Sequence, residues 1–231
     1  MRRKTFAVDI DGTITENGGG RIHLGALSSL RHMRKLGHNV ILVSGRSSVE
    51  GYLLSVYGGL NTIAVGENGG CITHGANEHV LLGDKAKCVE ALQLIRSKLS
   101  NVKEKPVFPR MTEVVLERTF DINDAKKVAR EKNLDVVLSD SQYAIHINSA
   151  GINKATGFKQ IMERLDIKSE DVISIGDSDT DVPLFEMANL SVAVGNASDQ
   201  VKSRATMVVS AHAGDGVLEA LDKIAPILSE L

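Results

Sequence analysis

Short apolar runs, each followed by glycine and small polar residues, recur along most of the chain. They are rich in valine and isoleucine and are apolar at consecutive positions. Strands with two apolar faces are typical of parallel sheets that helices cover on both sides. The pattern predicts strands at residues 6–10, 40–43, 62–65, 172–175, 192–194 and 207–209.

Helical patterns lie between these runs. Apolar residues recur every three or four positions over 26–36, 155–165 and 217–224, and Gly37 follows the first segment. This spacing predicts helices with one apolar face, and glycine commonly lies just past a helix end. The alternation of strands and helices predicts an α/β fold with a Rossmann-like, doubly wound parallel sheet as its core.

The middle of the chain follows another order. We expect a helix over 85–99, two strands including one at 112–117, a helix that Asp121 caps, and strands at 136–138 and 143–147. An α+β block inside an α/β chain indicates an inserted domain. The predicted limits are 1–83 and 154–231 for the core and 84–153 for the insert.

Net charge, cysteine count and the length of the apolar runs limit the kinds of partner and location that we expect. The net charge of -2 over 231 residues provides no polycationic field, so we expect no nucleic-acid partner. Cys71 and Cys88 are too few for a disulfide framework and are expected to be buried thiols. Asp9 and Asp11 interrupt the apolar stretch behind the basic N-terminus, and no apolar run has membrane-spanning length. We expect a soluble, cytoplasmic protein without a membrane partner; the sequence carries no signal for an oligomeric state.

Asp9 and Asp11 lie at the carboxyl end of the first predicted strand. In open parallel sheets, ligands bind beyond the carboxyl ends of the strands. Two residues apart on a strand, the two acids point to the same side and repel each other. A divalent cation relieves that repulsion, and Mg2+ is the natural candidate because it prefers carboxylate and phosphate oxygens. An Asp-Gly turn alone would explain Asp11 but leaves the acid on the strand unexplained.

Further polar residues follow other predicted strands. Asp177, Asp179 and Asp181 are three acids in five positions, more than capping of a helix requires. We assign Asp177 and Asp181 to the metal and leave Asp179 as a cap or surface residue. Ser44 precedes a glycine, where a hydroxyl and backbone N–H groups can hold phosphoryl oxygens, and Lys154 can offset phosphoryl charge.

Four motifs, at 9–13, Ser44, Lys154 and 176–181, resemble in order those of the haloacid dehalogenase-like hydrolase superfamily. The resemblance spans the chain outside the insert. The insert resembles the type-two cap of the Cof-like branch, as do the sequences at 67–70 and 195–197. Thr180 departs from this branch, in which many members carry asparagine. Cap size and chain length are most similar to archaeal phosphoglycolate phosphatases.

The resemblance implies a role for each matched residue. Asp9 would be the nucleophile and Asp11 the general acid/base. Ser44 and Lys154 would bind the phosphoryl group. Mg2+ would be held by Asp9, Asp177, Asp181 and Asp11, the last through its backbone carbonyl. The implied activity is Mg2+-dependent hydrolysis of a small phosphate monoester, with 2-phosphoglycolate as the first candidate, through an aspartyl-phosphate intermediate.

The leaving group is the less determined part of this prediction. Aromatic residues make up 3% of the chain, which disfavours a stacking platform for nucleotides or long sugars. Arg110, His146 and Asn148 are candidates to recognise a small acid, although each is better explained as an ordinary surface or strand residue. A sugar-phosphate phosphatase, a phosphomutase and, more remotely, a non-enzymatic phosphoacceptor module stay open as alternatives.

Overall fold

The larger of two sheets has eight strands, in the order β11-β10-β9-β1-β2-β3-β4-β5. The computed structural model describes residues 3–16, 20–141 and 143–229. In chain order the strands are β1 (Thr5–Val8), β2 (Asn39–Val43), β3 (Ala64–Gly66), β4 (Cys71–Gly75), β5 (Glu78–Leu81), β9 (Val172–Gly176), β10 (Leu190–Ala193) and β11 (Met207–Val208). All pairs from β11 to β3 are parallel, which confirms the predicted α/β fold.

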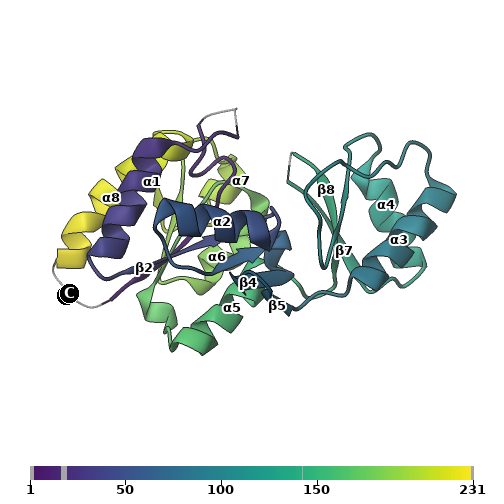
Figure 1. Cartoon of the computed structure of the whole chain (residues 1–231). Coiled ribbons are helices and arrows are strands. Elements are labelled where there is room, and N and C mark those ends of the chain that lie inside the picture. The colour runs from purple at the N-terminus through teal and green to yellow at the C-terminus, as the bar shows by residue number, and fades with distance from the viewer. Residues whose placement is uncertain (1–2, 17–19, 142, 230–231) are drawn as a thin grey trace.

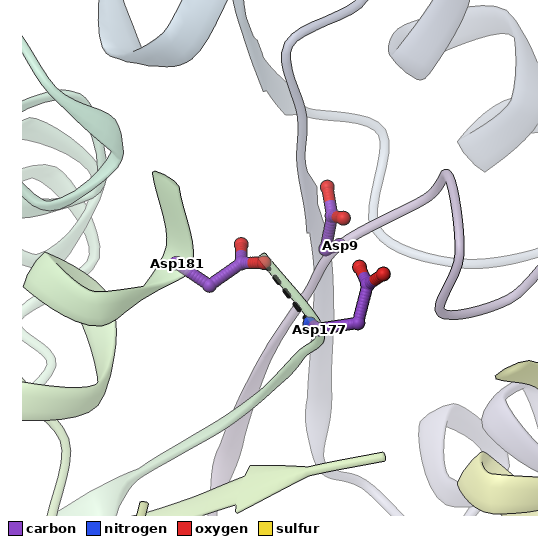
Figure 2. Close-up of side chains that lie close together, drawn as sticks. All are labelled: Asp9, Asp177 and Asp181. Atoms are coloured by element: carbon purple, nitrogen blue, oxygen red, sulfur yellow. Dashed lines mark hydrogen bonds between the residues drawn. The ribbon is translucent and has the colours of Figure 1, made fainter. Parts of the chain in front are cut away.

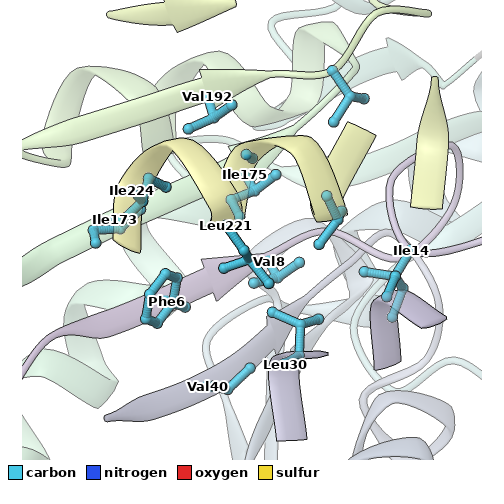
Figure 3. Close-up of a cluster of buried hydrophobic side chains, with 14 of the residues drawn as sticks. Phe6, Val8, Ile14, Leu30, Val40, Ile173, Ile175, Val192, Leu221 and Ile224 are labelled. Atoms are coloured by element: carbon cyan, nitrogen blue, oxygen red, sulfur yellow. The ribbon is translucent and has the colours of Figure 1, made fainter. Parts of the chain in front are cut away.

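Helices cover both faces of this sheet, as its doubly apolar strands require. Phe6 and Val8 of β1 face one buried cluster, whereas Ala7 faces another with Phe158. Figure 3 shows the first cluster, in which Leu221 lies close to β1. The helices of this part are α1 (Leu24–Lys35), α2 (Ser48–Gly58), α5 (Lys154–Leu165), α6 (Val182–Met187), α7 (Asp199–Lys202) and α8 (Ala213–Ser229).

A hairpin that the sequence did not predict extends one edge of the sheet. Strands β4 and β5 run antiparallel to their neighbours, with Ile72 paired to Val80. Most of β5 is exposed, so it carries no continuous apolar run of the kind that predicted the central strands. Directly after this hairpin the chain leaves the sheet.

The second sheet has the order β6-β8-β7 and is antiparallel. Its elements are α3 (Lys85–Lys98), β6 (Val114–Leu116), α4 (Ile122–Glu131), β7 (Val136–Asp140) and β8 (Ile145–Ser149). Figure 1 shows them gathered at one side of the larger sheet. Between α3 and α4 the described chain has one strand instead of the expected two, because Glu104 meets Leu116 only in an isolated bridge. The exact limits of the inserted domain stay a prediction.

The inserted part has its own apolar core. Helices α3 and α4 contribute Leu92, Ile95 and Val128 to a cluster with Leu116 and Ile147 of the smaller sheet. As predicted, Asp121 caps α4, accepting a hydrogen bond of 2.8 Å from the Asn123 backbone N–H. One face of this sheet is therefore covered by helices, and its other face can serve a site shared with the larger sheet.

The packing of α1 on the larger sheet yields a stability test. Leu30 is 0% exposed, so Leu30→Ala leaves a cavity and should lower the free energy of unfolding by about 2–5 kcal/mol. Leu24 lies on the same helix but is 76% exposed, and Leu24→Ala should stay within about 0.5 kcal/mol of the original chain. Urea unfolding measures both. Equal losses would contradict the described packing.

Candidate active site

Three carboxylates meet where β1 and β9 end. Asp9 directly follows β1, Asp177 directly follows β9, and Asp181 lies in the turn before α6. The two strands are paired in parallel, and the Asp9 backbone N–H continues their ladder by donating to the Ile175 carbonyl at 3.0 Å. One carboxylate oxygen from each acid lies within 4.8 Å of the others (Figure 2). The sequence prediction placed these acids at the same edge of the sheet, where they are found.

Lys154 lies among these acids. It is the first residue of α5 and is only 2% exposed. Its Nζ donates to Asp9 Oδ1 at 2.7 Å and to Asp181 Oδ1 at 2.6 Å. Burial alone would lower the pKa of Lys154, but the two carboxylates outweigh it and raise this pKa above its ordinary value. The lysine is therefore a fixed positive charge inside the site.

One ammonium does not balance three clustered carboxylates, two of them buried and the third, Asp177, half-buried. Burial and the negative charge of Asp181 raise the pKa of Asp9 well above its ordinary value, although Lys154 opposes the rise. Burial and Asp181 likewise raise the pKa of Asp177 to about 7. The part of both shifts that comes from Asp181 reflects an excess of negative charge that a divalent cation would relieve. The donor set consists of hard carboxylate oxygens, so it fits Mg2+.

The acids are held in place by a network of hydrogen bonds. Asp181 Oδ2 accepts from the backbone N–H groups of Asp177 and Ser178, at 3.1 Å and 3.0 Å. Asp177 accepts from Thr13 Oγ1 at 3.2 Å and from Asn196 Nδ2 at 3.0 Å. Sequence reasoning gave Asn196 no role. Its position shortly after β10, at the same edge of the sheet, was the available signal.

Gly12 lets the first loop approach Asp177 closely. Its φ is +78°, a left-handed conformation that favours glycine. A Cβ at this position would lie 2.2 Å from Asp177 Oδ2, well inside van der Waals contact. The Gly12 carbonyl also accepts from Asn196 Nδ2 at 2.9 Å. The glycine of the first motif therefore fits both the backbone conformation and the position of Asp177.

Asp11 lies apart from the three clustered acids. Its two oxygens accept from Nε and Nη2 of Arg46, each at 2.7 Å, and its side chain is 46% exposed. Arg46 also pairs with Glu50 of α2, at 3.1 Å. Sequence reasoning gave Arg46 no role.

Ser44 directly follows β2, the strand next to β1. It is buried, and its hydroxyl accepts from the Arg46 backbone N–H at 3.1 Å. Thr180, which departs from the family pattern, has its hydroxyl 2.8 Å from that of Ser178. The assignments of Asp11 and Ser44 to acid/base work and phosphoryl binding stay predictions.

Arg110, His146 and Asn148, the candidates for recognising a small acid, converge instead on a buried carboxylate. Glu113 Oε2 lies 3.0 Å from His146 Nδ1 and accepts from Asn148 Nδ2 at 3.1 Å. Glu113 Oε1 lies 3.6 Å from Arg110 Nε. His146 and Asn148 thus contact Glu113 through hydrogen bonds and Arg110 through a longer ion pair, and a role for any of the three in recognising a substrate stays a prediction.

A cavity of about 340 Å³ lies between the two sheets. From the larger sheet's side it is lined by Asn68, Lys154 and Thr180, and from the smaller sheet's side by Lys126, Ser139 and Asn148, among others. It therefore adjoins the charged cluster through Lys154. Its size suits a small molecule.

Comparison with known proteins identifies the family. The sequence profile of haloacid dehalogenase-like hydrolases matches residues 6–108 and 110–221. The chain belongs to this family. A phosphoglycolate phosphatase of Nitrosopumilus maritimus is 67% identical to this hydrolase over 231 residues, which is 100% of both chains.

Solved structures agree on the fold of this hydrolase. A crystal structure of a Thermoplasma acidophilum protein superimposes with a TM-score of 0.86 at 23% identity, covering 97% of this chain and 99% of the other. A sugar phosphatase of subclass IIB of the family superimposes with a TM-score of 0.79 at 18% identity, covering 96% and 99%. Within the described residues, no helix is both long and apolar enough to cross a bilayer.

The close approach at Gly12 yields a test of the metal site. Gly12→Ala should displace Asp177 and weaken Mg2+ binding at least about tenfold, as measured by calorimetry. Gly37→Ala is the matched control, since Gly37 also has positive φ but has nothing within 4 Å of an added Cβ. An equal effect of both changes, or none from Gly12→Ala, would contradict the assigned role of Asp177.

The raised pKa of Asp177 yields a second test. Mg2+ binds the carboxylate form, so it must displace the proton that Asp177 retains below a pH of about 7. Mg2+ affinity should therefore fall as the pH is lowered from about 8 to about 6, and Mg2+ binding in this range should release the proton held by Asp177 into the buffer. Calorimetry in buffers of different ionisation enthalpy measures both quantities. A constant affinity over this range would argue against Asp177 as a ligand.

Proposed function

We propose that this chain is a Mg2+-dependent phosphatase that hydrolyses 2-phosphoglycolate to glycolate and phosphate. The observation that carries the proposal is the buried Asp9 carboxylate, held by Lys154 beside Asp177 and Asp181 at the end of the central strands. The 67% identical phosphoglycolate phosphatase of Nitrosopumilus maritimus supports the substrate. The family and the absence of a membrane-spanning helix in the described residues support a small cytoplasmic metabolite as partner.

Asp9 is the proposed nucleophile. One of its oxygens attacks phosphorus in line as the bond from phosphorus to the ester oxygen breaks, which gives an aspartyl-phosphate. Lys154 and Ser44 hold the phosphoryl oxygens and offset their charge. Asp9, Asp177, Asp181 and the Asp11 carbonyl would hold Mg2+, which would supply further positive charge at the phosphoryl group.

Asp11 is the proposed proton carrier. It gives a proton to the departing alkoxide and later takes one from the water that attacks the aspartyl-phosphate. That attack breaks the bond from phosphorus to Asp9 and regenerates the carboxylate. In the structure Arg46 donates a hydrogen bond to each of the two Asp11 oxygens. The Asp11 side chain therefore has to leave this contact to reach a substrate. The exposure of Asp11 is compatible with such a movement.

The inserted part is proposed as the cap that selects the substrate. The cavity between the sheets takes residues from both, so a leaving group bound there touches both parts of the chain. Its volume of about 340 Å³ is sufficient for 2-phosphoglycolate. The sugar-phosphate phosphatase is the nearest rival, since a subclass IIB sugar phosphatase has the same fold.

Substitution of the nucleophile is the most direct test. Asp9→Asn removes the attacking oxygen and one charge from a crowded acid cluster, so we expect turnover to be abolished and the fold retained. Phosphate release and circular dichroism measure the two effects. Appreciable activity in the purified variant would refute Asp9 as nucleophile.

A substrate panel separates the rival functions. With Mg2+ present, kcat/KM should be highest for 2-phosphoglycolate among that ester, sugar phosphates, phosphoserine and an aryl phosphate. A preference for a sugar phosphate would favour the sugar-phosphatase alternative. Phosphate release only when a bisphosphate activator is added would favour a mutase, and a stable phosphoprotein without steady-state release would favour a phosphoacceptor module.

A further inference from the structure

Three consecutive residues between β3 and β4 have left-handed backbone conformations. The φ values are +55° for Glu67, +52° for Asn68 and +102° for Gly69. Such conformations are uncommon for residues other than glycine and persist where the surroundings hold them in place. Contacts with neighbouring segments must therefore hold this loop, residues 66–70, in its conformation.

The loop is held from both parts of the chain. The buried Glu67 carboxylate accepts from the backbone N–H groups of Met111 and Thr112, at 2.7–3.0 Å, and from the Thr112 hydroxyl at 2.7 Å. The Asn68 backbone N–H donates to the Ser44 carbonyl at 3.2 Å. A Cβ on Gly69 would lie 1.9 Å from the carbonyl oxygen of Asn153, the residue before Lys154. The loop thus packs against three segments: Ser44 and the residues after it, the start of α5, and the inserted part.

Asn68 presents its amide at this junction. Its side chain lines the cavity between the sheets together with Lys154, and it lies against Gly45, the residue after Ser44. Asn68 is only 5% exposed, and within the described chain neither its Nδ2 nor its Oδ1 has a hydrogen-bond partner. Buried polar groups are nearly always paired, because leaving them unpaired costs free energy. The Asn68 amide, buried and unpaired at a residue that lines the cavity, therefore has a donor and an acceptor left for a bound molecule.

Two other polar residues at the cavity have hydrogen-bond partners. Lys154 is committed to Asp9 and Asp181, and Asn148 Nδ2 donates to the Glu67 carbonyl and to Glu113. Lys126 also lines the cavity, as do the carboxylates of Asp140 and Asp179. Asn68 combines an unpaired donor with proximity to the proposed phosphoryl site.

We propose that Asn68 is a substrate-binding residue whose Nδ2 donates a hydrogen bond to the carboxylate of the leaving group. The proposal rests on the proposed function, because 2-phosphoglycolate carries a carboxylate one carbon from the ester oxygen. The rigid loop fixes the distance between this amide and the phosphoryl site. Asn68 thereby favours a short, carboxylated leaving group over an uncharged one.

The test compares two esters that differ at one position. Ethyl phosphate has the two-carbon skeleton of 2-phosphoglycolate but lacks its carboxylate. Asn68→Gly removes the amide and tolerates the left-handed backbone, so kcat/KM for 2-phosphoglycolate should fall on the order of 10- to 100-fold, as expected for one lost hydrogen bond to a charged group. For ethyl phosphate, kcat/KM should change less than about threefold, since that substrate does not use the amide.

A second substitution at Asn68 and a control substitution elsewhere accompany this test. Asn68→Asp keeps the shape but replaces the donor with a negative acceptor, so 2-phosphoglycolate should lose more activity than with Asn68→Gly. Asn101→Gly makes the same change at an exposed asparagine with a φ of +62° and should leave both substrates unaffected. Thermal unfolding of each variant shows whether it is folded.

The outcomes separate this proposal from the proposed function. Equal losses on both substrates, or no loss on either, would overturn the role of Asn68 while leaving the phosphatase activity standing. A wild-type enzyme that hydrolyses ethyl phosphate as well as 2-phosphoglycolate would overturn the proposed substrate, and this assignment with it.

Discussion

The contact of Lys154 with two buried carboxylates is the interaction on which the site depends. Its ammonium lies 2.7 Å from Asp9 and 2.6 Å from Asp181, and all three side chains are shielded from water. Charges buried in this way are costly unless they are paired. Because Asp177 adds another carboxylate, the pairing is incomplete, and the raised pKa values of Asp9 and Asp177 express that imbalance. The same imbalance makes the site a natural receptor for a divalent cation.

The order of strands and helices in the chain brings these charged residues together. Parallel strands β1 and β9 are neighbours, so the acids that follow them meet at one edge. Helix α5 begins at this edge and delivers Lys154, and the loop at residues 66–70 packs against that helix start. The inserted part attaches to the same loop through Glu67 and Thr112. The charged cluster and the cavity between the sheets are therefore built on one continuous set of contacts.

The sequence allowed much of this arrangement to be predicted, because strand ends can be read from apolar runs. Asp9 and Asp177 were expected at one edge of the sheet, and the structure brings them together. The edge hairpin β4–β5 was missed, since its exposed strand lacks such a run. The pairing of Arg46 with Asp11 and the free amide of Asn68 depend on side-chain packing between distant segments. Periodicity and motif spacing carry no information on such contacts.

In the proposed mechanism, Asp9 becomes phosphorylated during turnover. Borohydride added during Mg2+-dependent hydrolysis reduces an aspartyl-phosphate to homoserine, and peptide mass spectrometry then locates the changed residue. If the aspartyl-phosphate forms at Asp9, homoserine should be found at position 9 alone, and only when both substrate and Mg2+ are present. Modification at another acid, or turnover without any trapped residue, would contradict this mechanism.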